Sequence, residues 1–133
     1  GNLQQACIVI ADIDHFKEIN DRFGHIQGDK ILQETAALLR DYTRDRASIG
    51  RWGGEEFLLI LPEFNLEEAR AYCEVLRQTI ATASHFENLT LTMSFGVASY
   101  TPAKTIEQTL IFADRALYAA KQSGRNRVEI ATA

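Results

Sequence analysis

Two acidic parts of the chain have the residue types needed to share a divalent cation. Asp12 ends an apolar run, and Glu55-Glu56 follows the glycine pair Gly53-Gly54. A hairpin that turns at the glycines and pairs beside the first strand would bring Glu55 close to Asp12. Carboxylates on one sheet edge repel one another unless a cation lies between them, and Mg²⁺ combines a few carboxylates with water and phosphate oxygens. Such ions would assist attack on phosphorus. Spacing alone also allows the alternative that these acidic residues are ordinary solvated turn residues.

Polar residues after Asp12 form a second candidate group, suited to a nucleotide. Its members are His15-Phe16-Lys17, Asn20, Gly24-His25 and Gly28-Asp29. Backbone N–H groups at a strand-to-helix turn bind phosphates. Asn20 and Asp29 together have the donors and acceptors to read guanine, or else they are helix caps. His25, which follows a glycine, is alternatively a turn or packing residue.

Basic residues near the C-terminal end of the last helix form a third group, made of Lys121, Arg125 and Arg127. The helix dipole favours positive side chains there without any ligand. Phosphate binding is the interpretation that a catalytic site requires. Arg51 and Trp52, which flank the glycines, are interpreted as strand residues.

Hydrophobic patterns predict the elements that must position these groups. Residues 5–12 form a continuous apolar run and are expected to be a strand buried on both faces. Residues 31–42 have the periodicity of a helix that packs on a sheet. Residues 47–52 and 55–61 are expected to be the strands of a hairpin, with Gly53-Gly54 supplying the positive φ angles of a two-residue turn.

The rest of the chain predicts two capped helices and two strands. Asn65 with Glu68, and Thr105 with Gln108, are capping boxes that open helices with apolar stripes over 66–80 and 106–120. Alternation over 89–97 predicts a half-buried strand, Gly124 lies where a C-terminal cap belongs, and 127–130 predicts a last strand.

The element order is β-α-α-β-β-α-β-α-β, which favours an α+β fold. A hairpin in the middle of such an order predicts a mostly antiparallel sheet with helices on one face. The palm-like, ferredoxin-like split βαβ arrangement is the simplest match.

Composition limits the class of protein. The 133 residues fit one domain, and the net charge of −4 disfavours a nucleic-acid polymer as partner, since such binding needs many Lys and Arg contacts. The longest apolar run, 6–11, is too short to span a bilayer, and no signal peptide is visible. Cys7 and Cys73 are expected to be buried free thiols, which favours a cytoplasmic location.

Three stretches of the chain together resemble the signatures of one family. RWGGEEF at 51–57 resembles the signature of the GGDEF family of diguanylate cyclases, in its common GGEEF form. DIDHFKEINDRFGHIQGD at 12–29 is similar to the second signature of that family, and ALYAAKQSGRNR at 116–127 is similar to its third. The three matches occur in order over nearly the whole chain, whereas GGEEF alone would be a weak match. The chain thus resembles a single GGDEF-type catalytic domain over residues 1–133.

The resemblance implies a palm-like enzyme that joins two GTP molecules into cyclic di-GMP with release of pyrophosphate, using two Mg²⁺ or Mn²⁺ ions. By motif position, Asp12, the Ile13 carbonyl and Glu55 would hold the metals, with Glu56 in support. Glu55 would also be the base for the attacking ribose 3′-hydroxyl.

The resemblance also implies nucleotide contacts. The substrate-binding residues would be Asn20, His25 and Asp29 at guanine, and Lys121, Arg125, Lys17, the backbone at His15-Phe16 and the Gly53-Gly54 turn around the phosphates. Each domain would hold one GTP, so a second copy would have to face it as a homodimer. No membrane contact is expected from the domain itself.

The chain departs from the family in two ways. The family's product-inhibition site is an Arg-x-x-Asp separated by five residues from the first glycine of the signature, and here Arg44 is present while Ala47 replaces the Asp. Feedback inhibition there is therefore expected to be weak or absent. The family also has a segment before the first strand that this chain does not contain, so the chain is interpreted as lacking its N-terminal segment and following an upstream sensory or dimerisation domain.

Three rival functions fit the sequence less well. A non-catalytic GTP- or cyclic di-GMP-binding module is disfavoured because Asp12, Glu55 and Glu56 are all kept. Another palm-domain nucleotidyl cyclase or polymerase-like module is disfavoured because Asn20 and Asp29 suit guanine. A purely structural dimerisation domain would not need three groups of ligand-binding residues.

Overall fold

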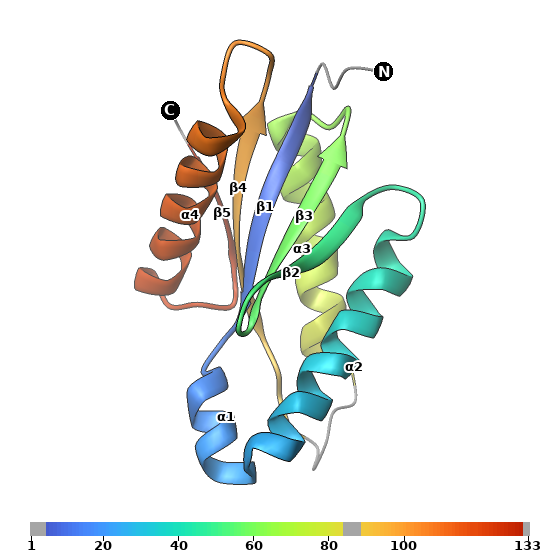
Figure 1. Ribbon diagram of the computed structural model, residues 1–133, viewed down its shortest axis with the longest axis vertical. Helices are drawn as coiled ribbons and strands as arrows, with labels where there is room; N and C mark the ends of the chain where they lie inside the picture. The colour runs from blue at the N-terminus through green and yellow to red at the C-terminus, as the bar shows by residue number, and fades with distance from the viewer. Residues whose placement is uncertain (1–4, 84–88, 132–133) are drawn as a thin grey trace.

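A computed structural model describes residues 5–83 and 89–131. Its elements follow the predicted order (Figure 1): β1 (Ala6–Ile13), α1 (Phe16–Phe23), α2 (His25–Thr43), β2 (Ser48–Gly53), β3 (Glu56–Pro62), α3 (Leu66–Thr82), β4 (Met93–Tyr100), α4 (Ile106–Gln122) and β5 (Val128–Ile130). None of the helices in these two segments is long and apolar enough to cross a membrane.

The five strands form one sheet in the order β2-β3-β1-β4-β5. β1 pairs antiparallel with β3 on one side and with β4 on the other, and only the β4–β5 pair is parallel. β1 is therefore the central strand, and every one of its residues is buried, as the apolar run predicts. The α+β, mostly antiparallel palm-like fold expected from the sequence is confirmed.

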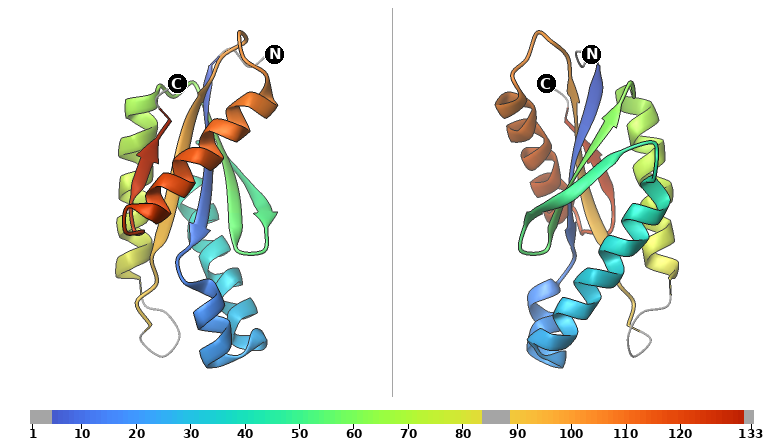
Figure 2. Two further views of the ribbon diagram at one scale, coloured as in Figure 1. Left: turned by 90° about the vertical axis from the view of Figure 1, so that its left-hand side faces the viewer. Right: turned by 45° about the vertical axis from the view of Figure 1, so that its right-hand side comes forward.

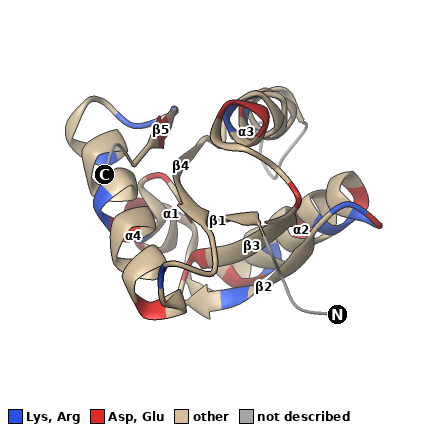
Figure 3. Cartoon of the chain, turned by 90° about the horizontal axis from the view of Figure 1, so that it is seen from above, with Lys and Arg blue, Asp and Glu red and all other residues tan. Residues whose placement is uncertain are grey.

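Helices cover both faces of the sheet, and the expectation of helices on one face is wrong. Figures 2 and 3 show α4 on one face of β1 and β4, with α2 and α3 on the other. The face covered by α4 holds a small cluster of its own, made of Ile10, Ala98, Ala113 and Leu117. Gly96 lets α4 approach closely, because a Cβ there would lie 2.2 Å from the Ala113 carbonyl oxygen.

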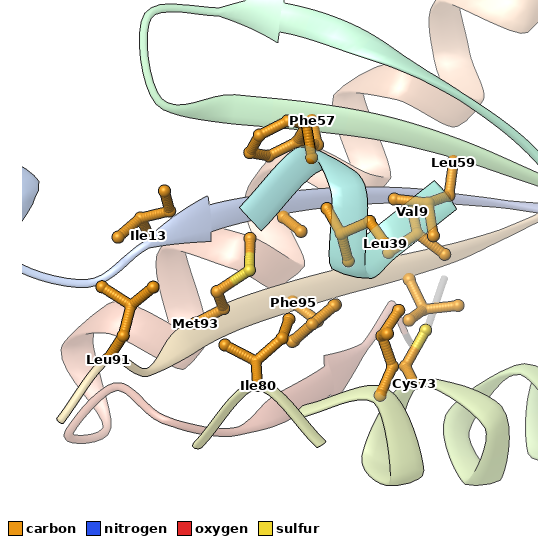
Figure 4. Packing of buried hydrophobic residues seen from close by; sticks show 14 of the residues in the cluster. Val9, Ile13, Leu39, Phe57, Leu59, Cys73, Ile80, Leu91, Met93 and Phe95 are labelled. Atoms are coloured by element: carbon orange, nitrogen blue, oxygen red, sulfur yellow. The ribbon is translucent and has the colours of Figure 1, made fainter. Parts of the chain in front are cut away.

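The larger core lies between the sheet and helices α2 and α3. Figure 4 shows Val9, Ile13, Phe57, Leu59 and Phe95 projecting from the strands toward side chains such as Leu39, Cys73 and Ile80 from the helices. These side chains are 0–2% exposed, which makes them the packed interior that fixes the sheet against its helices. Cys7 and Cys73 are free and buried, and burial raises the pKa of both thiols, so neither is a reactive group.

Both predicted capping boxes are present. The Asn65 side chain accepts from the Glu68 amide at 2.8 Å, and the Glu68 side chain accepts from the Asn65 amide at 2.9 Å. Thr105 and Gln108 form the same reciprocal pair at the start of α4. Gly124, just beyond α4, has φ +118°, the left-handed backbone expected of a residue that ends a helix.

The strand expected at 89–97 is shifted toward the C-terminus. Pairing with β1 begins only at Met93, because β1 ends at its partner Ile13. Leu91 is still buried in the core at 1% exposure, so the alternation of apolar and polar residues is genuine. It extends beyond the end of the partner strand β1. The strand is also not half-buried, since residues 93–98 are buried on both faces once α4 covers the second one.

The glycines of the hairpin do not have the expected role. Gly53 is the last residue of β2, and Gly54 and Glu55 form the turn, after a register irregularity between Arg51 and Gly53. Neither glycine has a positive φ. A Cβ at Gly54 would meet no atom of the described chain within 4 Å, so this glycine leaves open space beside Glu55.

Candidate active site

Strand pairing brings the two acidic groups together, as the sequence predicts. Asp12 is opposite Glu56 in the β1–β3 register, and the Ile13 amide donates to the Glu55 carbonyl oxygen at 3.3 Å. In Figure 1 the end of β1, the β2–β3 turn and the C-terminal end of α4 all lie at the same end of the sheet, above α1. Glu55 lies in the turn itself rather than in a strand, so its side chain is less constrained by sheet pairing than that of Asp12.

Asp12 is buried in a negative environment. Burial raises its pKa to about 6, and the charges of Glu55 and Glu56 add to the rise, although the Lys121 ammonium opposes it through an ion pair with Oδ2. The other carboxylate oxygen, Oδ1, is buried and has no hydrogen-bond partner within the described residues. Burial, together with the charges of Asp114 and Glu55, likewise raises the pKa of Glu56.

These features fit a cation. An unpartnered buried carboxylate oxygen beside further acidic groups is stabilised by a positive charge, and the Lys121 ammonium, paired with Oδ2, supplies part of it. No three His, Cys, Asp or Glu side chains converge in the described parts of the chain. Mg²⁺ accepts such a site, because it is bound through one or two carboxylates plus phosphate oxygens and water.

A cavity of about 160 Å³ opens beside Asp12, and most of the predicted phosphate contacts line it. Its walls are Asp12, Ile13, Asp14, His15, Phe16, Lys17, Glu18, Glu55, Lys121 and Arg125. The start of α1 faces this space, with His15 at φ 57° and no side chain capping the helix among the described residues. Such a helix start binds anions through its backbone N–H groups.

The predicted guanine-reading residues lie outside this cavity, at the junction of α1 and α2. Gly28 packs so closely against α1 that a Cβ there would lie 1.7 Å from Asn20 Oδ1. Asn20 Oδ1 is buried and has no hydrogen-bond partner in the part of the chain described. Asp29 and His25 are exposed beside it. A volume of about 160 Å³ is too small for a whole nucleotide, so the cavity alone could hold only part of one.

The remaining predicted site residues do not line this cavity. Gly53, Gly54 and Glu56 belong to the hairpin next to Asp12. Arg44 is exposed at the C-terminal end of α2, and Ala47, where an Asp was expected, is partly buried against the core. A larger cavity of about 550 Å³ adjoins Arg46, Glu63, Phe64 and Tyr72. It contains none of the predicted catalytic residues.

Sequence reasoning missed one buried acidic residue of this region. Asp14 is 6% exposed and accepts hydrogen bonds from the hydroxyls of Thr92 and Ser94, both at 2.7 Å, and from the Asn126 amide at 2.9 Å. Its position two residues after Asp12 was visible, but the three donors come from residues far along the chain. No local pattern indicates such a contact.

The comparisons with known proteins agree with this geometry. The family profile described as "Diguanylate cyclase, GGDEF domain" matches residues 2–127. The chain is 45% identical over 127 residues to the diguanylate cyclase DgcP of Pseudomonas aeruginosa, covering 93% of the chain and 19% of that protein. It is 39% identical over 131 residues to the diguanylate cyclase VdcA of Vibrio cholerae, covering 94% of the chain and 39% of that protein.

Solved structures give the same result. The active GGEEF domain of a diguanylate cyclase from Vibrio cholerae superposes with a TM-score of 0.90 at 38% identity, covering 98% of this chain and 85% of that one. The GGDEF domain of DgcB from Caulobacter crescentus, solved with c-di-GMP, has a TM-score of 0.89 at 32% identity, with 96% and 78% covered. The chain spans only about a fifth to two fifths of the curated relatives named above. It belongs to the diguanylate cyclase GGDEF-domain family.

Proposed function

We propose that this chain is a diguanylate cyclase domain that condenses two GTP molecules into cyclic di-GMP and pyrophosphate. The observation that carries the proposal is the meeting of Asp12 and Glu55 beside Lys121 and Arg125 at one cavity. Acidic groups for cations and basic groups for a polyphosphate are both needed for nucleotidyl transfer, and neither set alone would indicate it.

The residues of the chain divide the work of one half-reaction. Lys121, Arg125 and the backbone at the start of α1 hold the β- and γ-phosphates, with Lys17 as a further phosphate contact. The 3′-hydroxyl of the facing GTP attacks the α-phosphorus, pyrophosphate leaves, and Glu55 accepts the hydroxyl proton. Most of the acceleration then comes from positioning and from charge placed before the reaction starts.

Asn20 and Asp29 select guanine. The amide of Asn20 meets the acceptors of the ring, and the Asp29 carboxylate accepts from N1–H and the exocyclic amine. The unpartnered Asn20 Oδ1 supports this role, because a buried amide oxygen without a donor gains from one that a ligand brings. His25 lies beside the base.

Two Mg²⁺ or Mn²⁺ ions are proposed for each site, held by Asp12, the Ile13 carbonyl and Glu55, with Glu56 in support. When bound, they would neutralise the triphosphate and polarise the reacting phosphorus. Asp12 serves this purpose only as the carboxylate, and Lys121 must release Asp12 Oδ2 for the ion and turn toward phosphate.

The larger assembly is also part of the proposal. Residues 1–133 act as one catalytic domain within a longer cytoplasmic protein, and an upstream domain brings two copies face to face. Free buried thiols are in line with a reducing compartment. With Ala47 in place of the Asp, Arg44 alone does not form a working product-inhibition site.

A non-catalytic GTP- or cyclic di-GMP-binding module remains the alternative; turnover by the parent protein separates the two, and Glu55→Gln tests the proposed base. The variant keeps the size of the side chain but has no base, so we expect no cyclic di-GMP from GTP and Mg²⁺, as measured by mass analysis of the product. Thermal unfolding should match the parent protein, because Glu55 lies in a turn. Undiminished product from Glu55→Gln would remove this residue from the mechanism. An inactive parent protein at high concentration would instead favour the binding module.

A further inference from the structure

The turn that carries Arg125 has an unusual backbone. Arg125 and Asn126 are consecutive non-glycine residues with positive φ angles of 63° and 48°. Asn tolerates this left-handed region, but Arg does so at a cost, and strained residues of this kind persist only where neighbouring groups hold them. Neighbouring groups must therefore hold this turn in place.

Asp14 is one of them, and it lies directly after the last residue of β1. Its Oδ2 accepts from the Asn126 amide at 2.9 Å and from the Thr92 hydroxyl at 2.7 Å, while Oδ1 accepts from Ser94 at 2.7 Å. A carboxylate only accepts hydrogen bonds, which suits three converging donors, and bonds to a charged acceptor are the stronger kind. Asp14 therefore ties the end of β1, the start of β4 and the α4–β5 turn together.

A second contact comes from α3. Arg77 Nη1 donates to the Asn126 side-chain oxygen at 2.7 Å, while Glu74 holds the same guanidinium by an ion pair. Asn126 is thus held through its backbone by Asp14 and through its side chain by Arg77. Arg125, the residue between α4 and Asn126, has its amide bound to the Ala120 carbonyl oxygen at 2.9 Å. Its backbone is therefore fixed on both sides.

We propose that Asp14 is a positioning residue for triphosphate binding, acting through the turn that presents Arg125. The inference rests on the proposed function, in which Arg125 holds the terminal phosphates. Asp14 lines the same cavity as Arg125, so its contacts fix the turn at the wall where the phosphates bind. A group held in the bound conformation before the ligand arrives loses less freedom on binding.

The test is a double-mutant cycle on nucleotide binding. Asp14→Ala, Arg125→Ala and the double variant are compared with the parent chain by calorimetric titration in Mg²⁺. The probes are GMP and the α,β-methylene analogue of GTP, whose carbon bridge prevents pyrophosphate from leaving. We expect Asp14→Ala to weaken binding of the analogue about tenfold, the size of a lost charge-assisted contact, and to leave the affinity for GMP unchanged. In the Arg125→Ala background the same change should have no effect.

Ser94→Ala is the matched control, since it removes a hydroxyl from the same carboxylate and leaves the Asn126 bond. Ser94→Ala should lower the stability of the fold without weakening binding of the analogue. Three results would each overturn the inference. One is that Ser94→Ala weakens analogue binding as much as Asp14→Ala does, and another is that Asp14→Ala weakens GMP binding as much as analogue binding. The third is that Asp14→Ala still weakens analogue binding about tenfold in the Arg125→Ala background. If Asp14→Ala does not fold, Asp14→Ser, which keeps a hydroxyl for the strand but is too short to reach the turn, replaces it in the cycle.

The two proposals fail differently. If Arg125→Ala weakens the analogue and Asp14→Ala does not, only the inference is wrong. If Arg125→Ala itself has no effect, the phosphate role of Arg125 in the proposed function is wrong, and the inference fails with it.

Discussion

At the scale of single residues, the ionised form of Asp12 opposes folding. Its side chain is 5% exposed, and its pKa of about 6 lies above the ordinary value of 3.8, because burial and neighbouring acids outweigh the ion pair with Lys121. The folded protein therefore holds a proton on Asp12 more tightly than the unfolded chain does. Stability falls as the pH rises from about 4 to about 6, and the cost of the ionised group is complete above that range.

Asp12→Asn should therefore stabilise the metal-free protein at pH 8. We expect the free energy of unfolding to rise by on the order of 1 kcal/mol, less than the shift alone implies because Asn is itself a buried polar group. The gain should disappear toward pH 4, where Asp12 is neutral. Urea denaturation at both pH values with a chelator measures it, with the exposed Asp41→Asn as control. A less stable Asp12→Asn at pH 8 would contradict the prediction.

At the scale of elements, two glycines determine how closely helices approach their neighbours. Gly96 lets α4 pack onto β4, and α4 carries Lys121 to Asp12. Gly28 lets α2 pack onto α1 where Asn20 lies. Neither glycine has a positive φ, so both are needed for space rather than for backbone conformation.

Gly96→Ala should destabilise the fold by about 3 kcal/mol, the upper part of the range for overpacking. The new Cβ would lie 2.2 Å from the Ala113 oxygen and 2.3 Å from the Leu117 nitrogen, and these are backbone atoms of a helix that cannot rotate away. Gly50→Ala is the matched control, since its Cβ would meet nothing described within 4 Å. Urea denaturation of both variants measures the difference, and equal midpoints would disprove the close approach of α4.

Gly28→Ala should affect binding and leave stability intact. The nearest atoms to its new Cβ belong to side chains, with Asn20 Oδ1 at 1.7 Å and Asn20 Cγ at 2.9 Å. The Asn20 side chain must therefore rotate away. Ala also favours a helix by up to about 1 kcal/mol over Gly. We expect an unchanged or higher melting temperature and a KM for GTP raised about tenfold, as after loss of one buried hydrogen bond.

Gln27→Ala, one residue away, serves as the control for Gly28→Ala. Asp29→Ala should also raise the KM for GTP. A Gly28→Ala enzyme with the parent KM would show that Asn20 does not read the base.

The sequence could predict what local pattern determines and could not predict what the tertiary structure adds. Element order, both capping boxes and the meeting of Asp12 with the hairpin are confirmed, because an apolar central strand leaves the hairpin few other places to pair. The start of β4 was misplaced because strand length is set by the partner, which ends at Ile13. The contacts of Asp14 with Thr92 and Asn126 were missed because they join residues about 80 and 110 positions apart.

At the scale of the whole molecule, the sheet order places all the reactive groups at one end. β1 lies between β3 and β4, so the acidic hairpin reaches Asp12 through strand pairing, while Lys121 reaches it from α4. In the proposed function, the cavity of about 160 Å³ lined by Asp12, Glu55, Lys121 and Arg125 would hold the phosphates of one nucleotide. A product made from two nucleotides would then require a second copy of the site.

Specific activity should therefore rise with protein concentration. If one chain holds one GTP, the 3′-hydroxyl on one copy attacks the phosphorus on another, and the rate depends on how often two copies meet with their cavities facing. Far below the dissociation constant of the dimer, product per protomer should double with each doubling of protein. Joining two copies by a flexible linker replaces that encounter by an effective concentration in the millimolar range, so the dependence should vanish in the tandem chain. Dilution series of both proteins with GTP and Mg²⁺ measure this. A specific activity of the single chain that stays constant down to concentrations where light scattering finds only monomer would mean that one site completes both transfers.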